Sequence, residues 1–485
     1  MAALAQTNDA PEGSLSIDAA LAQIKRIVGP TGWTDSPDAM RPHLEDWRGH
    51  YKGRARMVVK PASTQDVSSI VTACAAAGIP MVPQGGNTSL CGASTPEKDG
   101  RAIVLSLARM NRVRKLDPDN HTITVEAGCL LQDIQTKALD SDRYFPLSLA
   151  SEGSCMIGGN LSTNAGGVNT LRYGNARDLA LGIEAVLPDG RILNGLTGLR
   201  KDNTGYDLMD LLIGAEGTLG IITAAVLKLF PKPTDQRSAF CAVPDLASAV
   251  SLLSRARAES GDAVEAFEFM PRTLLDLVLA HIPDTADPLS ERHGFYVLMD
   301  LVSTSNRSGD LGATMEAILT TAFEDGLVLD AAIAQSETQR QAFWRLRENT
   351  SEGQRREGPS IKHDVSVPVS AIASFYDRAF EEVLKIDPDV RLVGYGHVGD
   401  GNLHYNLQAP RGADAKTFFK QTAAFNHAVH DVVAEMGGSI SAEHGIGKLK
   451  RADLAHYKDP VALQVMRAIK DALDPKGLMN PGKVI

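Results

Sequence analysis

The run GSCMIGGNLSTNAGG, residues 153–167, decides the fold of this chain. It is one of three stretches in which glycine is joined by Ser, Thr or Asn, the others being PQGGNTS (83–89) and GAEGTLGIIT (214–223). Such stretches let successive backbone N–H groups turn toward one anion, because glycine tolerates positive φ and has no Cβ in the way. A single loop of this kind is most often only a tight turn. Three of them in the first half predict a pyrophosphate-bearing cofactor.

The sequence around these loops predicts strands, and the sequence after them predicts helices. Runs rich in β-branched residues lie at 102–107, 122–128, 181–190 and 220–230. They are separated by turn signals such as Pro188-Asp189-Gly190. After PKP at 231–233 the chain becomes rich in Ala, Leu and Glu at helical spacing, as at 245–260 and 312–326. We therefore expect a strand-rich first domain and a second domain of strands and helices.

Composition narrows the class of protein. The 485 residues hold 49 Lys and Arg against 59 Asp and Glu, and no basic cluster exceeds KLKR at 448–451. A nucleic-acid partner is therefore not expected, because the formal charge of −10 gives no positive footprint. Five cysteines lie far apart without a CxxC pair, which fits a reducing compartment. Residues 1–16 lack Lys and Arg, and no 18-residue apolar run occurs, so we expect a cytoplasmic protein without a transmembrane segment.

Histidines cluster in the second half of the chain. If Asp400-Gly401 forms a two-residue hairpin turn, His397 lies directly opposite His404. Opposed side chains have Cβ atoms about 4.5–5.5 Å apart, which suits two imidazoles on one metal ion, and Asn406 would share their face. Glu443 is the candidate third ligand of a His₂Glu site with an open position. A histidine pair held by ordinary hydrogen bonds is the alternative.

Two further histidines, His427 and His430, stand three residues apart in a helical stretch. We expect them to lie on a helix face and not to form a second metal site, because helical neighbours of this kind arise by chance.

A candidate anion site precedes the histidines. In QAFWRLRENTSEGQRRE (341–357), Arg347 and Ser351 are four residues apart and share the face of a predicted helix. Lys362 follows in the predicted strand IKHDVSVP (361–368). Arginine can hold a carboxylate with two parallel hydrogen bonds, and lysine adds a point charge. The three residues predict an anion clamp, with an ordinary charged helix surface as the alternative.

Together these motifs resemble a known family. The resemblance runs from about residue 57 to 485 through PQGGNTS, GSCMIGGNLSTNAGG, LRYGN, RKDNTGYDL, GAEGTLGIIT, GHVGDGNLHYN, EHGIG and DPKGLMNPGKVI. These stretches resemble the FAD-linked 2-hydroxy-acid dehydrogenases of the vanillyl-alcohol-oxidase superfamily. Within it, RKDNTGYDL and the spacing of Arg347, Ser351 and Lys362 are most similar to enzymes that act on D-2-hydroxyglutarate.

The resemblance implies an α+β architecture. Its parts are a vanillyl-alcohol-oxidase-type FAD-binding domain, an α/β substrate domain with an antiparallel sheet, and a C-terminal segment that returns to the flavin. The implied boundaries are an N-terminal helical extension at 1–55, the FAD-binding domain at 56–236, the substrate domain at 237–436 and the C-terminal segment at 437–485.

The resemblance also implies how FAD is held. The first two loops would bind the pyrophosphate, residues 216–221 would line the flavin or ribityl side, and Asn480 would approach from the tail. Covalent relatives often carry a flavin-linked histidine where this chain has Gly85-Gly86-Asn87, so FAD is expected to be non-covalent. The implied FAD contacts are Pro83, Gln84, Gly85, Gly86, Asn87, Thr88, Ser89, Ser151, Gly153, Ser154, Ile157, Gly158, Asn160, Thr163, Asn164, Gly166, Gly167, Glu216, Gly217, Gly220, Ile221 and Asn480.

For the chemistry, the resemblance implies a metal ion and a histidine base. The implied ligands of a divalent ion, expected to be zinc, are His397, His404 and Glu443. His444 matches the general base, which accepts the hydroxyl proton while a hydride passes to flavin N5. The implied substrate contacts are Arg347, Ser351 and Lys362 for the distal carboxylate, with Asn406 and His444 at the reacting end.

The expected reaction is oxidation of D-2-hydroxyglutarate to 2-oxoglutarate. Electrons would pass to an external acceptor such as an electron-transferring flavoprotein, and a homodimer is the expected assembly. One alternative keeps this mechanism with D-lactate, glycolate or another D-2-hydroxy acid as substrate. A more distant alternative is a flavin-binding subunit without substrate chemistry.

Overall fold

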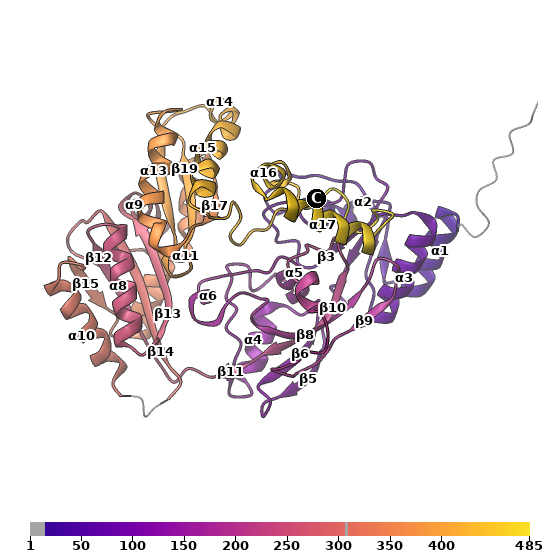
Figure 1. Ribbon diagram of the computed structural model, residues 1–485, viewed down its shortest axis with the longest axis horizontal. Helices are drawn as coiled ribbons and strands as arrows, with labels where there is room; N and C mark the ends of the chain where they lie inside the picture. The colour runs from indigo at the N-terminus through magenta and orange to yellow at the C-terminus, as the bar shows by residue number, and fades with distance from the viewer. Residues whose placement is uncertain (1–14, 306–308) are drawn as a thin grey trace, which may run out of the picture.

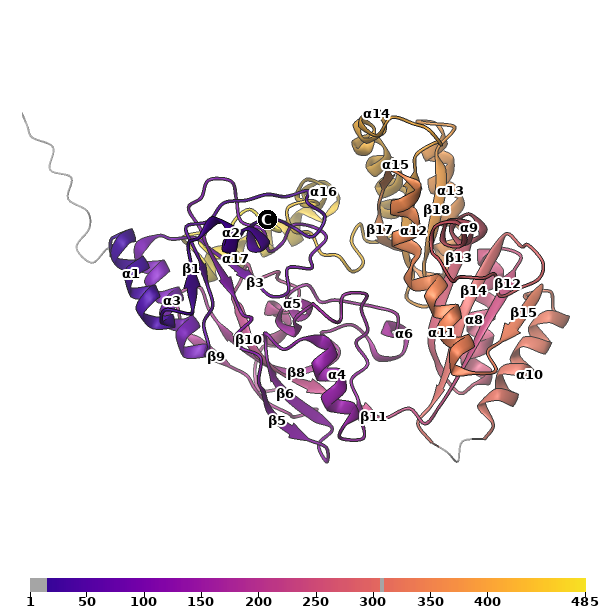
Figure 2. The ribbon, with the colours of Figure 1, turned by 180° about the vertical axis from the view of Figure 1, so that it is seen from behind.

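The structure, a computed structural model, describes residues 15–305 and 309–485. Two lobes lie side by side (Figure 1), and the view from behind shows the same separation (Figure 2). Residues 15–231 and 437–485 build the N-terminal lobe, and residues 235–436 build the middle lobe. Residues 1–14 of the expected N-terminal extension lie outside the described residues.

Two main sheets form the N-terminal lobe. The first has the order β1-β2-β4-β3, in which β2, β4 and β3 are parallel and β1 is antiparallel. The second is antiparallel, in the order β5-β6-β10-β8-β9, and its central strand β10 is apolar as a central strand requires. The strands, with the separate pair β7 and β11, are β1 (Trp33–Thr34), β2 (Val58–Val59), β3 (Met81–Gln84), β4 (Ile103–Ser106), β5 (Val113–Asp117), β6 (Thr122–Glu126), β7 (Arg143–Tyr144), β8 (Ala180–Val186), β9 (Ile192–Asn194), β10 (Ile221–Lys228) and β11 (Phe230–Pro231).

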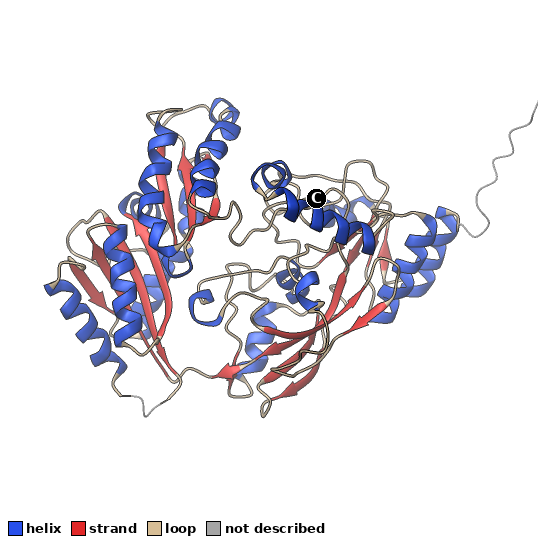
Figure 3. Ribbon diagram, viewed as in Figure 1, coloured by secondary structure: helices blue, strands red, loops and turns tan. Residues whose placement is uncertain are grey.

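Short helices accompany these sheets (Figure 3). Helix α3 shows why they form where they do: the Ser63 hydroxyl caps its start by accepting from the backbone N–H of Asp66, and Gly78 ends it at φ 65°. The helices are α1 (Ile17–Val28), α2 (Pro37–Leu44), α3 (Thr64–Ala77), α4 (Leu131–Leu139), α5 (Ile157–Ser162), α6 (Thr170–Tyr173) and α7 (Met209–Leu212).

One large antiparallel sheet forms the middle lobe. Its order is β15-β12-β14-β13-β18-β19-β16, and β17 also pairs with β19. The strands are β12 (Asp235–Val243), β13 (Val264–Pro271), β14 (Phe295–Ser303), β15 (Asp330–Ile333), β16 (Ser360–Ile361), β17 (Asp364–Ser366), β18 (Arg391–His397) and β19 (Asn402–Gln408).

Helices cover both faces of this sheet. Alternate residues of β14 enter different cores: Met299 belongs to a core that includes residues of α8, α10, α13 and α15, whereas Leu298 belongs to one that includes residues of α9 and α11. The elements are α8 (Leu246–Glu259), α9 (Arg272–His281), α10 (Leu311–Glu324), α11 (Glu337–Glu348), α12 (Thr350–Glu357), η1 (Val369–Ala371), α13 (Ile372–Leu384), η2 (Val398–Asp400), α14 (Ala415–Lys420) and α15 (Thr422–Glu435).

The C-terminal segment lies against the N-terminal lobe (Figure 1), where it adds α16 (Arg451–Tyr457) and α17 (Pro460–Leu473). Met479 forms a parallel bridge to Met81 of β3, and both residues belong to one core. The predicted α+β fold and the predicted return of this segment are confirmed. Across the described residues, no helix combines the length and the apolar character needed to cross a membrane.

Candidate active site

The three glycine-rich loops meet in the N-terminal lobe. A Cβ on Gly86 of the first loop would lie 2.1 Å from the carbonyl oxygen of Ser154 in the second, so this close approach requires glycine. The third loop is joined to the second by a hydrogen bond from the backbone N–H of Glu216 to the carbonyl oxygen of Ser162, 2.7 Å long. Backbone donors from separate parts of the chain therefore lie near one another.

Four non-glycine residues in this region have a left-handed backbone. The φ angles of Asn87, Asn164, Glu216 and Asn480 are 55°, 49°, 51° and 45°. This conformation costs on the order of 1 kcal/mol per residue and concentrates at ligand sites. All four residues are among the predicted FAD contacts, so the strain coincides with the predicted cofactor site.

The region also contains buried acceptors without a partner. The Oδ1 atoms of Asn160 and Asn480 accept no hydrogen bond from the described residues, and both side chains are buried. A buried polar atom left unpaired costs about 1–3 kcal/mol, which a donor on a bound group would recover. The flavin ring carries such an N–H donor, so these residues fit FAD.

Two predicted FAD contacts use their side chains elsewhere. The Gln84 side chain is 2% exposed and donates from Nε2 to the carbonyl oxygen of His43 at 3.0 Å. Asn87 donates from Nδ2 to the carbonyl oxygens of Pro42 at 3.0 Å and Glu45 at 2.8 Å. Both side chains hold the first loop against α2, so FAD would meet them through their backbone.

Glu216 links the third glycine-rich loop to the EHGIG segment (443–447). Its carboxylate accepts hydrogen bonds from the backbone N–H groups of Ile446 at 2.7 Å and Gly447 at 2.8 Å. Asn480 donates from Nδ2 to the carbonyl oxygen of Glu216 at 2.7 Å. The cofactor loops and the segment that carries Glu443 and His444 are therefore directly bonded.

The predicted hairpin register is wrong by two residues. A 3₁₀ turn replaces the two-residue turn, so that His397 pairs with Asn402 and His404 pairs with Tyr395. Because a shift by an even number keeps every side chain on its face, His397 and His404 still share one face. Their ring centroids are 5.5 Å apart.

Further ligand-type side chains gather beside this pair. The ligand atoms of Asp364, His404, Glu443 and His444 all lie within 4.8 Å of one another. Nε2 of His397 lies 3.4 Å from Oε1 of Glu443. That distance is close to the ~3.4 Å edge of a tetrahedron with metal–ligand bonds of ~2.1 Å. The donor set fits a divalent ion that prefers nitrogen and oxygen.

In this cluster, burial at His397 is outweighed by Glu268 and Glu443, which raise its pKa to about 9, so a metal would displace a proton there. Burial decides the charge of the other three groups. It lowers the pKa of His404 well below 6.5, with a further lowering by His397, and it lowers the pKa of His444 although Asp364 opposes this. Burial also raises the pKa of Glu443 to about 8. Neutral imidazoles are the form that binds metal, and a cation would restore the charge of Glu443.

Asp364 organises the loop that carries Glu443 and His444. It is 2% exposed, and its Oδ2 accepts the backbone N–H groups of Glu443 at 3.0 Å and His444 at 2.9 Å. Its Oδ1 accepts from Nδ2 of Asn402 at 3.1 Å. Oδ2 also lies 3.4 Å from Nδ1 of His444. A carboxylate there favours a proton on Nδ1 and leaves the Nε2 lone pair free to accept one.

Tyr395 stands between the anion clamp and the histidines. The Arg347 guanidinium lies 5.1 Å from its ring centroid, the Ser351 hydroxyl 3.4 Å from its hydroxyl, and the His404 ring centroid 5.0 Å from its own. Burial alone would raise the pKa of Tyr395, but Arg347 and Lys362 outweigh it and lower that pKa. Arg347 and Ser351 therefore converge, although they stand on the separate helices α11 and α12 and not on one helix.

Lys362 and Asn406 add free polar groups. Lys362 is half-buried, and no ion pair or hydrogen bond of its ammonium is found among the described residues. Burial lowers its pKa, and nearby Arg48 lowers it further. Asn406 is 2% exposed and donates from Nδ2 to Gln354 at 3.0 Å, while its Oδ1 has no partner in the described chain. Both residues are available to a polar ligand.

Sequence reasoning missed three residues of this arrangement. Tyr395 lies two positions before His397, so strand periodicity could have found it. The alternation of IKHDVSVP does put Asp364 on the face of Lys362, but it gives Asp364 no role. Glu268 lies 129 positions before His397, and no local signal announces it.

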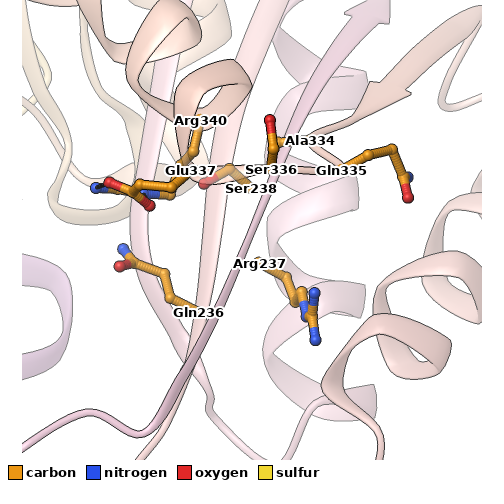
Figure 4. Close-up of a pocket in the computed structure, with 8 residues that line it drawn as sticks. All are labelled: Gln236, Arg237, Ser238, Ala334, Gln335, Ser336, Glu337 and Arg340. Atoms are coloured by element: carbon orange, nitrogen blue, oxygen red, sulfur yellow. Dashed lines mark hydrogen bonds and ion pairs between the residues drawn. The ribbon is translucent and has the colours of Figure 1, made fainter.

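A small cavity elsewhere in the middle lobe contains none of the predicted site residues. It has a volume of about 100 Å³ and lies between β12 and the start of α11 (Figure 4). Arg340 is paired with Glu337 at 2.7 Å there, and Ser238 donates to the buried carboxylate of Asp300. Because these groups are paired within the chain, we assign the cavity no ligand.

Comparison with known proteins places this geometry in a family. A family model described as an FAD binding domain matches residues 55–195, and one described as the C-terminal domain of FAD linked oxidases matches residues 232–484. The mitochondrial D-2-hydroxyglutarate dehydrogenase of Arabidopsis thaliana is 38% identical over 469 residues, which cover 95% of this chain and 80% of that relative. The chain belongs to the D-2-hydroxyglutarate dehydrogenase family of FAD-linked enzymes.

Other members of the D-2-hydroxyglutarate dehydrogenase family agree. The mitochondrial enzyme of Bos taurus is 38% identical over 468 residues, covering 96% of this chain and 83% of its own. A D-2-hydroxyglutarate–pyruvate transhydrogenase of Saccharomyces cerevisiae is 36% identical over 460 residues, covering 93% and 91%. The predicted class, an FAD-linked D-2-hydroxy-acid dehydrogenase, is confirmed.

Solved structures of low identity share the fold. The chain superimposes on p-cresol methylhydroxylase with substrate bound at a TM-score of 0.75 and 17% identity, covering 98% of both chains. An alkyldihydroxyacetonephosphate synthase gives a TM-score of 0.74 at 19% identity, covering 99% of this chain and 88% of the other. These likenesses confirm the vanillyl-alcohol-oxidase-type fold and carry no statement about substrate.

The predicted cytoplasmic location is wrong by the same comparison. The relatives from Arabidopsis thaliana and Bos taurus are named as mitochondrial proteins. The five cysteines are free, and they indicate a reducing compartment without distinguishing one such compartment from another. The cytoplasmic prediction also depended on residues 1–16, of which residues 1–14 lie outside the described residues.

Proposed function

We propose that this FAD-linked enzyme oxidises D-2-hydroxyglutarate to 2-oxoglutarate with the help of a divalent metal. The observation that carries the proposal is the cationic group around Tyr395, where Arg347 and Lys362 lower the pKa of its hydroxyl. The second carboxylate of D-2-hydroxyglutarate would pair Lys362 and the terminal nitrogens of Arg347, whose Nε already pairs with Glu268. D-lactate would leave those groups without a partner in a buried site. The names of the relatives agree with this substrate.

The proposed metal ligands are His397, His404 and Glu443. The side chain of His404 makes no hydrogen bond within the described chain, and its neutral imidazole is the form a metal binds. Asp364 is left out of the proposed ligand set because its two oxygens accept three hydrogen bonds and Oδ2 also faces Nδ1 of His444 at 3.4 Å. His444 is excluded because the proposal assigns it the proton.

The proposed chemistry divides between cofactors and residues. When bound, FAD supplies a two-electron acceptor at flavin N5, and the metal supplies a Lewis acid that eases deprotonation of the substrate hydroxyl. His444 accepts the hydroxyl proton at Nε2, since burial keeps its imidazole neutral. Asp364 holds Nδ1 of the same ring and so keeps Nε2 directed to the substrate.

The two carboxylates of the substrate are proposed to be held separately. The distal carboxylate meets the terminal nitrogens of Arg347, the hydroxyl of Ser351 and the ammonium of Lys362. The α-carboxylate meets Asn406, which has one hydrogen of Nδ2 left after donating to Gln354. In this arrangement FAD occupies the proposed FAD-binding domain at 56–236. The substrate contacts come mainly from the proposed substrate domain at 237–436. The electrons pass from the reduced flavin to an external acceptor.

The test is anaerobic reduction of the purified flavoprotein. D-2-hydroxyglutarate should bleach the oxidised-flavin absorbance rapidly, while L-2-hydroxyglutarate, D-lactate and glycolate should do so much more slowly. Preference for a monocarboxylate would overturn the substrate and keep the class. Absence of bleaching by every one of the four would overturn the proposed reaction itself.

A further inference from the structure

Glu268 is the residue at which the two halves of the proposed site meet. It lies on β13, is 1% exposed, and is the direct sheet partner of His397 on β18. Its Oε1 lies 2.6 Å from Nδ1 of His397, and its Oε2 lies 2.6 Å from Nε of Arg347. One buried carboxylate therefore joins a proposed metal ligand to the proposed substrate clamp.

We propose that Glu268 is a positioning residue that fixes the ring nitrogen offered by His397 and the guanidinium edge offered by Arg347. The inference rests on the proposed function and deepens it, since it explains how metal and distal-carboxylate binding share one support. It assigns Glu268 no contact with substrate or metal.

The first half of the inference concerns His397. An ionised carboxylate only accepts hydrogen bonds, so Nδ1 of His397 must carry the proton of the 2.6 Å contact. When the imidazole is neutral, Nε2 then holds the lone pair, and Nε2 is the atom that faces Glu443 at 3.4 Å. When a carboxylate that holds a ligating histidine in this way is replaced, metal affinity typically falls 10- to 100-fold.

The second half concerns Arg347. A guanidinium can hold a carboxylate along the edge formed by Nε and one terminal nitrogen, or along the edge formed by both terminal nitrogens. Glu268 occupies Nε, and the ring of Tyr395 lies 5.1 Å from the guanidinium. The edge made by the two terminal nitrogens is left for the distal carboxylate.

The strand offers a matched control. Glu265 is a second buried glutamate of β13, and none of the predicted site residues is its hydrogen-bond or ion-pair partner in the described chain. Its Oε1 accepts no hydrogen bond there. Glu265→Gln therefore makes the same substitution on the same strand without touching the proposed site.

Two substitutions of Glu268 separate shape from charge. Glu268→Gln keeps the shape but has an oxygen at only one of the two positions that face His397 and Arg347, so one of these partners meets an NH₂ group. Glu268→Asp keeps the charge, but its shorter side chain cannot reach both partners. The glutamine variant thus tests the tautomer of His397, and the aspartate variant tests the placement of Arg347 at constant charge.

The first measurement is zinc affinity of the metal-free, FAD-loaded protein, by competition with a chromogenic chelator. Glu268→Gln should bind zinc 10- to 100-fold more weakly than the wild type. The second is the ratio of kcat/KM for D-2-hydroxyglutarate to kcat/KM for D-lactate, which should fall about tenfold or more in Glu268→Asp. Glu265→Gln should match the wild type in both measurements.

Unchanged zinc affinity in Glu268→Gln, or an unchanged substrate ratio in Glu268→Asp, would overturn the inference. If the glutamine variant loses its flavin or does not fold, zinc affinity of the aspartate variant decides the first half. The proposed function is judged on the wild type alone, by its substrate preference. The inference is judged on the difference between variants, and a wild type that binds no zinc would overturn its metal half.

Discussion

Arg347 shows how one buried contact restricts what a residue can do. Its Nε donates to Glu268, so only its two terminal nitrogens are left to bind the distal carboxylate. Arg347→Lys leaves a single nitrogen that cannot bind both carboxylates. We expect kcat/KM for D-2-hydroxyglutarate to fall by a factor equivalent to about 2–5 kcal/mol of transition-state stabilisation. This fall should be nearly as large as that in Arg347→Ala. The fall in kcat/KM for D-lactate should be much smaller. Steady-state kinetics on both substrates measures this.

A matched change on the same helix serves as the control. Arg345 is exposed and donates to the carbonyl oxygen of Pro283 at 2.9 Å, away from the site. Arg345→Lys should change both kcat/KM values by a factor equivalent to less than ~0.5 kcal/mol. If Arg347→Lys changes the two kcat/KM values as little as Arg345→Lys does, the nitrogens of Arg347 do not have the separate functions proposed here.

His404 carries the metal prediction at the same scale. His404→Ala, or removal of metal with a chelator, should abolish turnover while the flavin absorbance stays in place, because the cofactor loops lie in the other lobe. His427→Ala is the control, since His427 is exposed on α15 and stacks on His456 with ring centroids 6.1 Å apart. Full activity in metal-free protein would refute the Lewis-acid role.

At the scale of elements, two glycine-rich loops pack without room for a side chain. A methyl group at Gly86 would meet the backbone of Ser154 at 2.1 Å, so Gly86→Ala must push the loops apart. Overpacking of this kind costs about 1–3 kcal/mol, and we expect a matching loss of unfolding free energy and of bound FAD. Flavin content after gel filtration and urea unfolding measure the two effects.

The control for this prediction is a glycine with space around it. No atom would lie within 4 Å of a Cβ on Gly294, whose φ is not positive. Gly294→Ala should therefore keep FAD and stability, and an equal loss in both variants would mean that the packing of the two loops is not the cause.

Elements also show what the sequence could and could not predict. The β-branched run at 220–230 predicted the central strand β10, because this signal is local. The face shared by His397 and His404 survived a wrong register, since the shift was even. Glu268 could not be predicted because its place beside His397 depends on the pairing of β13 with β18, a contact between distant parts of the chain.

At the scale of the whole molecule, the lobes touch through α6. Nη1 of Arg172 donates to the carbonyl oxygens of Ala263 at 3.1 Å and Val302 at 2.9 Å in the middle lobe. Glu265 lies within electrostatic reach of Arg172, yet burial and Asp300 raise its pKa to about 7. A titratable group therefore sits close to the contact between the lobes.

This carboxyl predicts a pH-dependent stability. The folded state keeps a proton on Glu265 that the unfolded state, with a pKa near 4.5, releases first, so stability falls as pH rises from about 4.5 to about 7. The loss is on the order of 3 kcal/mol. Glu265→Gln should remove it, which makes the variant more stable than the wild type at pH 8 and little different near pH 4.5. Urea midpoints at both pH values measure this, and a pH-independent difference would contradict it.

The return of residues 437–485 to the N-terminal lobe has a consequence for biosynthesis. A ribosome releases the loops that fit FAD and the whole middle lobe before it releases Glu443 and His444, and Met479 completes the first core later still. A nascent chain that stalls or is cleaved before residue 443 contains the nucleotide loops but no proposed proton acceptor. Truncated translation products of this enzyme should therefore be unable to reduce their own flavin with substrate, whatever cofactor they collect.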